Sequence, residues 1–404
     1  MTKNRGLFIA TQLFSFKVYE NNKEEFARKL SLAKEKLDLK ALMIGAHLNP
    51  KDMAYTIELC KNNGISPYLW YPMLADILPS FDASHLRLTG YGQSSESFIL
   101  EEQRNSGEDF GFLCPVKAYQ DQDYFLLYQN YLESFEFEGV FLDKIRYPSP
   151  SNGLSDLLGC QCDMCLKEYS KRSMDPKKLF KELSEIYEHV ENIDDLKQII
   201  VHNYLEIKRF LDFREDRINK LAFKFIEAAR DRHLKVGVDL FSPSLARIVS
   251  QDYVQLSKMA DWIKPMLYLK TMGPAGLPIE LLSLIQIMKK ENHLLSESDV
   301  MEFIQDNIGL DLPKNGELLK NDGLDIHNFT TEIKKASGKL VNLNTNIYPG
   351  FEAVVFPPIC SMDSETLIGY LKEVRKNELK WFVLSWDISK IPENYFSLVG
   401  DFFV

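Results

Sequence analysis

The sequence contains no apolar run of about 20 residues, the length that a helix needs to cross a bilayer, so we expect no membrane-spanning helix. Its first residues are basic and then apolar, but polar side chains return after four positions and no small-residue cleavage site follows, which argues against a secretory signal. The chain also has no excess of positive charge, because 58 acidic and 48 basic residues give a net charge of −10. Nucleic acids and anionic membranes bind to basic faces. We therefore expect a cytoplasmic protein with neither partner.

Cysteine is scarce as well, with six residues in the whole chain, which is no disulfide framework for a protein in a reduced compartment. Three of the six nevertheless crowd together in the pattern Cys160-x-Cys162-x-x-Cys165. Sulfur atoms at this spacing can reach one ion, and a closed structural zinc site takes four such ligands. The pattern therefore predicts a structural Zn²⁺. Three free thiols in a loop, or a redox site, remain the alternatives.

The fourth zinc ligand has to come from elsewhere in the chain. Cys114 is the best candidate, because it lies in a Phe-Leu-Cys-Pro segment just before the helical stretch that leads into the expected fourth strand. Cys60 and Cys360 lie in helical or apolar surroundings that are typical of buried free thiols. With four thiolates the ion would have no open position, so we do not expect a catalytic zinc.

Short apolar, β-prone runs alternate with helical patterns along the chain. Eight such runs begin near residues 7, 41, 65, 139, 235, 262, 341 and 380. Runs that are apolar on both faces are typical of parallel sheets covered by helices, and eight strands close such a sheet into a (β/α)8 TIM barrel. A doubly wound open sheet is the alternative. No Gly-x-Gly-x-x-Gly motif or P-loop follows the first run, which argues against it.

The chain is longer than a minimal barrel of about 250 residues. The surplus falls into three stretches, at 76–110, 150–200 and 275–340, which follow the third, fourth and sixth expected strands. Loops after the strands of a barrel lie at its C-terminal face, where the chemistry of this fold is found. We therefore predict one domain over residues 1–404, with these insertions as walls of a substrate cleft.

Carboxylates and aromatic residues gather at the expected C-terminal ends of the strands. Asp143 follows the fourth run, Asp239 the fifth and Glu352 the seventh. Aromatic faces stack on sugar rings, and two carboxyl groups flank the bond that a glycosidase cleaves. The expected substrate-binding residues around these carboxylates are Trp70, Tyr71, Arg146, Tyr147, Tyr268, Lys270, Tyr348, Trp386 and Asp387.

Glycoside hydrolysis requires one protonated and one ionised carboxyl group. Asp143 has Lys144 and Arg146 close by in the chain, and a cation would favour the ionised form that a nucleophile needs. Glu352 has apolar neighbours, which suit a general acid, and Asp239 is the third carboxylate. The reverse assignment stays open.

Simpler structural roles also stay open for each of the four acidic residues. Asp239 and Asp387 could cap the elements that follow them. Asp143 could pair with an arginine, and Glu352 could be a solvated turn residue.

Two motifs resemble known families of barrel enzymes. The arrangement of Cys114 with the 160–165 cluster resembles the zinc site of the family 42 β-galactosidases, which carry Asn-Glu at the end of strand four. This chain has Leu-Asp-Lys over 142–144 there, so the catalytic residues of that family do not transfer. The segment Gly-Val-Phe-Leu-Asp-Lys-Ile-Arg-Tyr-Pro over 139–148 looks more like strand four of the glycoside-hydrolase-like barrels of the amylase-like superfamily. The resemblance covers residues 110–270.

These observations predict a glycoside hydrolase with a structural zinc and a carbohydrate substrate. A carbohydrate-binding barrel without catalysis is one alternative, and it would use the carboxylates only to hydrogen-bond sugar hydroxyls. A barrel lyase or isomerase with a catalytic divalent metal is another, in which Lys270 would act as a base. The sugar, the stereochemical course and the oligomeric state do not follow from the sequence.

Overall fold

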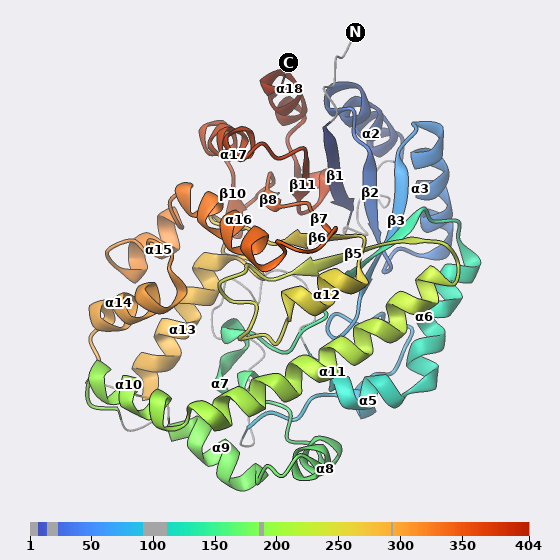
Figure 1. The fold of residues 1–404 in the computed structure, drawn as a ribbon. Helices are drawn as coiled ribbons and strands as arrows, with labels where there is room; N and C mark the ends of the chain where they lie inside the picture. Colours follow the sequence, from blue (N-terminus) through green and yellow to red (C-terminus); the bar gives the residue numbers. More distant parts are fainter. Residues whose placement is uncertain (1–6, 14–22, 92–110, 186–189, 292–293, 404) are drawn as a thin grey trace.

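A computed structural model describes residues 7–13, 23–91, 111–185, 190–291 and 294–403 of the chain. Its main feature is a nine-stranded, wholly parallel sheet in the order β7-β6-β5-β4-β3-β2-β1-β11-β8 (Figure 1). The strands are β1 (Phe8–Leu13), β2 (Ala41–Gly45), β3 (Ser66–Pro72), β4 (Gly139–Asp143), β5 (Lys235–Leu240), β6 (Trp262–Pro265), β7 (Asn346–Ile347), β8 (Gly350–Glu352) and β11 (Trp381–Ser385). Seven of the eight expected runs thus form one strand each. The predicted α/β class and parallel sheet are confirmed.

The seventh run differs from its prediction. Residues 341–345 form no strand, and Val341 is 77% exposed, so the run begins only at β7. It is then divided into β7 and β8 by Tyr348 and Pro349. Proline has no N–H for a sheet ladder, which explains the break.

The sheet is curled, so that β7 and β8, its two ends in the pairing order, follow each other directly in the chain. The residue after β6, Met266, forms an isolated parallel bridge with Gly350 of β8, and the Leu267 N–H donates to the Gly350 carbonyl oxygen at 2.9 Å. Contacts therefore run from β6 to both end strands.

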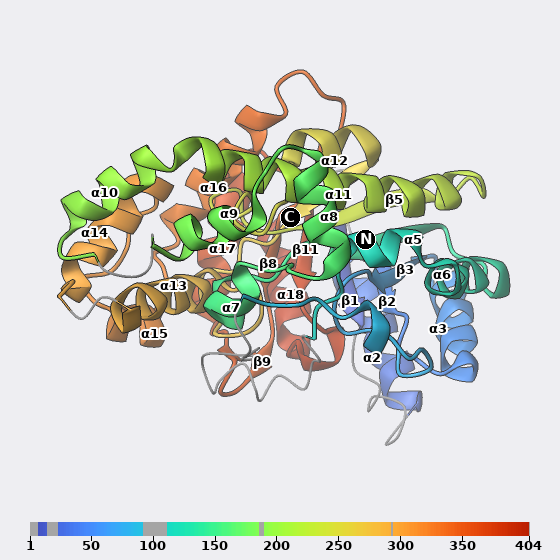
Figure 2. The same cartoon turned by 90° about the horizontal axis from the view of Figure 1, so that it is seen from below.

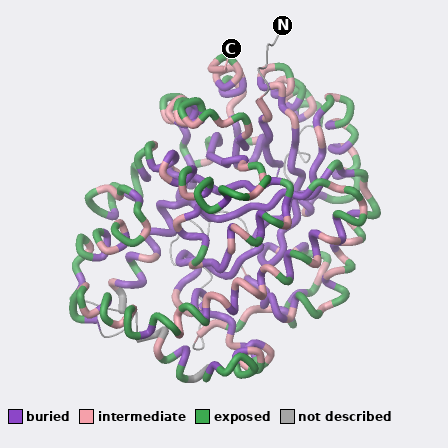
Figure 3. The backbone as a smooth tube through the Cα atoms, in the orientation of Figure 1, coloured by how far each residue is buried: buried purple, intermediate pink, exposed green. Residues whose placement is uncertain are grey.

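Aromatic rings fill the inside of the curl near the start of the strands. Phe141 stacks on Trp262 with a ring-centroid distance of 5.2 Å, and Trp262 stacks on Tyr348 at 4.9 Å. All five residues of β2 and all five of β4 are buried, as both faces of a covered parallel strand should be. Buried residues follow the strands through the centre of the molecule (Figure 3).

Helices cover the outside of the curl (Figure 1). They include α2 (Lys23–Leu37), α3 (Pro50–Asn62), α6 (Gln122–Ser134), α11 (Tyr204–Arg230), α12 (Tyr253–Met259), α17 (Ser364–Lys376) and α18 (Glu393–Phe402). Asn49 caps α3 and Asp121 caps α6, since each side chain accepts a hydrogen bond from a backbone N–H of the first turn. Phe225 of α11 packs on Tyr128 of α6, with ring centroids 4.8 Å apart.

Two of the three stretches predicted as insertions, 150–200 and 275–340, are largely helical where the structure describes them. The first of the three, 76–110, contains a short 3₁₀ turn, η1 (Ser84–Leu86), and its residues 92–110 lie outside the described part. The second contains η2 (Pro150–Asn152), α7 (Gly153–Leu157), α8 (Asp163–Lys171), α9 (Pro176–Glu185) and α10 (Ile193–His202). The third contains α13 (Leu277–Glu291), α14 (Glu297–Ile308), α15 (Gly316–Asp322) and α16 (His327–Lys339).

Helices from the second and third stretches meet in space. In Figure 2, α10 lies beside α14, and α13 and α15 lie on the same side of the molecule. The fold also contains a hairpin of β9 (Val355–Phe356) and β10 (Cys360–Ser361). A short helix, α5 (Pro115–Gln120), precedes α6. Among the described residues, no helix combines the length and apolar character that crossing a membrane requires.

Candidate active site

Asp143 is the last residue of β4, at the C-terminal edge of the sheet, and is 7% exposed. The Trp70 Nε1–H, from β3, donates to its Oδ2 at 2.9 Å. The backbone N–H of Lys144 donates to its Oδ1 at 2.5 Å. Both carboxylate oxygens are therefore held in fixed directions by N–H donors.

Asp239 lies on the neighbouring strand β5 and is 2% exposed. Its Oδ2 accepts a hydrogen bond from the Lys264 ammonium at 2.8 Å, while its buried Oδ1 has no hydrogen-bond partner among the described residues. The pKa of Asp239 is raised to about 7, because burial and the negative charge of Asp143 raise it by more than the neighbouring Lys264 ammonium lowers it. The two carboxyl groups thus influence each other, and Asp239 is the one poised to carry a proton near neutral pH.

Lys264 is a residue of this site that the sequence analysis missed. It lies in β6, is fully buried, and also donates to the Tyr268 hydroxyl at 2.6 Å. The sequence did hold a signal for this residue, a lysine inside an otherwise apolar strand. A buried ammonium requires a carboxylate partner, which points to a nearby acidic residue.

Glu352 is the last residue of β8 and is fully buried. Its Oε1 accepts hydrogen bonds from the backbone N–H groups of Lys270 and Thr271 at 2.6 and 3.0 Å. Its Oε2 accepts one from the Tyr370 hydroxyl of α17 at 2.7 Å. Burial raises the pKa of Glu352, and these donors oppose the rise. The carboxyl group holds the loop after β6 against α17.

Three further polar residues line a small cavity next to Asp143 and Trp70. The Lys144 ammonium lies 3.2 Å from the Asp76 carboxylate, and His47 Nε2 lies 2.8 Å from the Asp76 carbonyl oxygen. Burial lowers the pKa of His47, so that its imidazole is neutral at neutral pH. Neither His47 nor Asp76 stands out in the sequence, since each is an isolated polar residue in a loop.

The structure brings some of the predicted substrate-binding residues to this edge. Trp70 contacts Asp143 directly, as described. Tyr268 contacts Lys264 and packs edge-on against Trp386, with ring centroids 5.9 Å apart. Trp386 follows β11 and is partly exposed.

Other predicted aromatic residues lie away from the carboxylates. Tyr71 is fully buried outside the sheet against Tyr128 of α6, at a centroid distance of 4.9 Å. Tyr348 belongs to the aromatic stack inside the curl, near the start of the strands. Tyr147 is buried under the Arg214 guanidinium, which lies 4.0 Å from its ring centroid. These three residues contribute to core packing.

The predicted polar residues have structural partners. Arg146 lies over the rings of Phe112 and Phe241, at 4.8 and 4.5 Å from their centroids. Lys270 donates from its Nζ to the Asp322 carbonyl oxygen at 2.8 Å and lines a pocket bordered by α15 and the β9–β10 hairpin. Asp387 caps the 3₁₀ turn η3 (Ile388–Lys390) by accepting from the Ser389 N–H, which is the capping alternative noted above.

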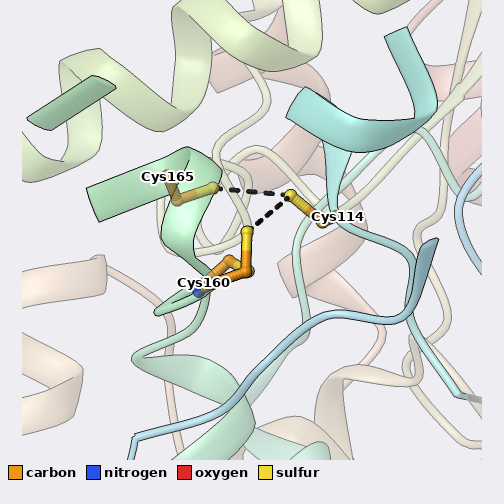
Figure 4. A group of neighbouring side chains, drawn as sticks. Cys114, Cys160 and Cys165 are labelled. Atoms are coloured by element: carbon orange, nitrogen blue, oxygen red, sulfur yellow. Dashed lines mark hydrogen bonds between the residues drawn. The ribbon is translucent and has the colours of Figure 1, made fainter. Parts of the chain in front are cut away.

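The four predicted cysteine ligands form one buried cluster. Their sulfur atoms all lie within 4.8 Å of one another. Cys114 Sγ is 3.4 Å from Cys165 Sγ and 3.7 Å from Cys162 Sγ. Cys114 precedes α5, Cys160 lies in the loop before α8 and Cys165 is in α8 (Figure 4). Cys162 is the N-cap residue of α8. A cluster that could bind a metal ion is therefore present.

The geometry of this cluster fits a tetrahedral thiolate site. Zinc–sulfur bonds of about 2.3 Å place the sulfur atoms of such a site about 3.8 Å apart, close to the observed distances. The backbone N–H groups of Thr89 and Cys162 point at Cys160 Sγ, at 3.4 and 3.5 Å. Such donors stabilise thiolates. Cys60 and Cys360 are buried elsewhere, and burial raises the pKa of Cys60 to about 12, as expected for inert thiols.

The fold is similar to those of solved structures that include two glycoside hydrolases. The glycoside hydrolase domain of PgaB (BpsB) from Bordetella bronchiseptica superposes with a TM-score of 0.53 at 12% identity, over 95% of this chain and 94% of that chain. The α-L-fucosidase isoenzyme 2 from Paenibacillus thiaminolyticus gives a TM-score of 0.51 at 11% identity, over 98% of this chain. The match spans 49% of the fucosidase. No protein-family model and no curated protein matches the sequence. At these identities the likeness concerns the fold.

Proposed function

We propose that the chain is a glycoside hydrolase that cleaves its substrate with two carboxyl groups, Asp143 and Asp239. The observation that carries this proposal is the pair itself. The two side chains lie at the same edge of neighbouring strands, and burial and the charge of Asp143 raise the pKa of Asp239 to about 7. Two interacting carboxyl groups in unequal environments are what glycosidic bond cleavage requires.

The hydrogen bonds suggest which role each group has. Asp143 accepts from Trp70 and from the Lys144 N–H, which suits an ionised nucleophile or a base for water. Asp239 suits the general acid, since it can hold a proton near neutral pH. Glu352, the partner suggested by the sequence, accepts from three donors of the chain. We assign it to positioning of the loop after β6.

The substrate we propose is a carbohydrate. Support comes from the fold shared with the PgaB domain and the fucosidase, and from the aromatic pair Tyr268 and Trp386 near the carboxylates. Of these two rings, Trp386 is partly exposed and can offer a face for stacking on a sugar ring, while the buried Tyr268 supports it. Most sugars carry no charge, so a chain of net charge −10 does not repel them.

We further propose that the curled sheet functions as one (β/α)8 barrel over residues 1–404. In this description β7 and β8 are the two halves of the seventh strand, which contacts β6 on one side and β11 on the other. The stretches at 76–110, 150–200 and 275–340 are then additions to the C-terminal face of one domain.

For the cysteine cluster we propose a structural Zn²⁺ bound by Cys114, Cys160, Cys162 and Cys165. Four thiolates complete a tetrahedral site, so the ion would take no part in catalysis. It would link the segment before α5 to the loop and helix that follow β4.

The activity is tested by incubating the protein with a panel of aryl glycosides of both anomeric configurations. We expect turnover by the wild type and a loss of at least about 100-fold in Asp143→Asn, because removal of a nucleophile or base abolishes its step. Glu352→Gln is the comparison variant, with a smaller loss if Glu352 only positions the loop. Sugar binding without turnover by the wild type would instead support the carbohydrate-binding alternative. Equal activity of wild type and Asp143→Asn would refute the assignment of Asp143.

A further inference from the structure

The peptide group that joins Asp143 to Lys144 is held on both sides. Its carbonyl oxygen accepts a hydrogen bond from the Met73 N–H at 2.9 Å. Its N–H donates to the Asp143 carboxylate at 2.5 Å. The orientation of this peptide therefore determines where Asp143 Oδ1 lies, and with it the direction of the whole carboxylate toward Trp70.

Two residues near this peptide group, Lys144 and Asp76, have an unusual backbone conformation. Lys144 has φ +53° and Asp76 has φ +54°, in the left-handed region that residues other than glycine seldom occupy. Strained backbone persists where surrounding contacts hold it in place, and it is frequent at functional sites.

The side chain of Lys144 forms an ion pair that holds this residue in place. The Lys144 ammonium lies 3.2 Å from the Asp76 carboxylate, and the two residues are only 7% and 8% exposed. Asp76 belongs to the same segment as Met73, so one stretch of chain contacts the peptide and the ammonium together. Ion pairs with so little exposure are weakly screened by solvent.

We propose that Lys144 is a positioning residue for Asp143: its ion pair with Asp76 keeps residue 144 in the left-handed conformation and so keeps the 143–144 peptide N–H on the carboxylate. If residue 144 relaxed to negative φ, either the ammonium would leave Asp76 or the peptide would turn away from Asp143. The consequence for catalysis rests on the proposed function of Asp143. The positioning itself does not.

The test uses the Trp70 indole as a reporter, because its N–H donates to Asp143. The chain has only four tryptophans, so ¹⁵N-tryptophan labelling gives four indole signals, and Trp70→Phe identifies the relevant one. We expect Lys144→Ala to move the Trp70 indole proton upfield and to lower kcat about tenfold with little change in KM. Lys144→Gly should restore the indole signal and raise kcat above that of the alanine variant, because glycine adopts positive φ without strain.

A second comparison isolates the ion pair. Asp76→Asn removes the charge, while asparagine still tolerates the left-handed conformation. We expect it to shift the Trp70 signal in the wild-type background and to have little further effect in the Lys144→Gly background. Glu378→Ala is the matched control, since Glu378 is an exposed residue with φ +53° far along the chain from this site. It should lower stability without moving the Trp70 signal.

The outcomes separate the two proposals. An unchanged Trp70 indole signal in Lys144→Ala would overturn the positioning role. A Trp70 signal shifted as strongly in Lys144→Gly as in Lys144→Ala would overturn it as well. Absence of turnover by the wild type on the glycoside panel would contradict the proposed hydrolase, whereas the indole signals would still decide whether Lys144 positions Asp143.

Discussion

At the scale of single residues, Asp143 and Asp239 differ in what surrounds them. Asp143 accepts from neutral N–H donors, whereas Asp239 is enclosed in the curl beside Lys264. A general acid must be protonated to act. If Asp239 has this proposed role, its pKa of about 7 would limit activity at high pH. We therefore expect kcat/KM to fall as the pH rises above about 7.

Replacing this acid should depend on the leaving group. In Asp239→Asn we expect a loss of about 100-fold or more with alkyl glycosides, whose leaving group needs a proton. Dinitrophenyl glycosides leave without protonation, so their turnover should fall much less. The rates of both substrate types, measured from pH 5 to 9, check this prediction. An equal loss for both would contradict the role of Asp239 as acid.

The Trp70 indole should also affect the rate. Trp70→Phe keeps an aromatic ring in the inner core but removes the N–H that donates to Asp143, so we expect kcat to fall about tenfold. Trp381→Phe is the control, since Trp381 stacks on Tyr348 near the start of the strands. Steady-state kinetics of both variants, with circular dichroism to verify folding, measure the difference. Similar kcat values in the two variants would contradict the prediction.

At the scale of elements, the cysteine cluster connects α8 and the preceding loop to the segment before α5. If it binds zinc, purified protein should contain about one ion per chain, and Cys162→Ser should contain less and unfold at a lower temperature. Elemental analysis and thermal unfolding check this. Cys60→Ser is the control, because Cys60 is buried outside the cluster. It should keep its zinc, and equal zinc contents in both variants would count against the site.

Elements also explain which expectations succeeded. Seven of the eight expected strands begin where their apolar runs begin, because such runs are local patterns. The start of the seventh strand did not follow, because the apolar residues of 341–345 meet no neighbouring strand in the fold. A β-prone run forms a strand only where a partner offers hydrogen bonds.

At the scale of the whole molecule, the buried carboxyl groups make stability depend on pH. The folded-state pKa of Asp239, about 7, exceeds its unfolded value of about 3.9, so the folded protein binds more protons between these values. Stability from this group is fully present below pH 4 and is lost as the pH rises through 7.

Asp239→Asn removes that titration. We expect its unfolding free energy, measured with urea, to depend less on pH between 4 and 7 than that of the wild type, by about 1 kcal/mol per pH unit. Surface carboxylates change stability equally in both proteins, so the difference reports on residue 239 together with its ion-pair partner Lys264. Parallel pH curves for the two proteins would show that Asp239 ionises normally.

The sequence by itself determined where seven of the eight expected strands begin, which cysteines come together and which acidic residues end strands, because each depends on patterns within short segments of the chain. Only the tertiary structure decided which side chains converge. Trp70 and Tyr71 are adjacent, yet alternation along β3 sends the first to Asp143 and the second to the outer core. The register of β5 on β6 likewise set Lys264 beside Asp239, and curling of the sheet brought Glu352 of β8 to the loop after β6. Such contacts depend on the register and curvature of strands far apart in the chain, which no local pattern specifies.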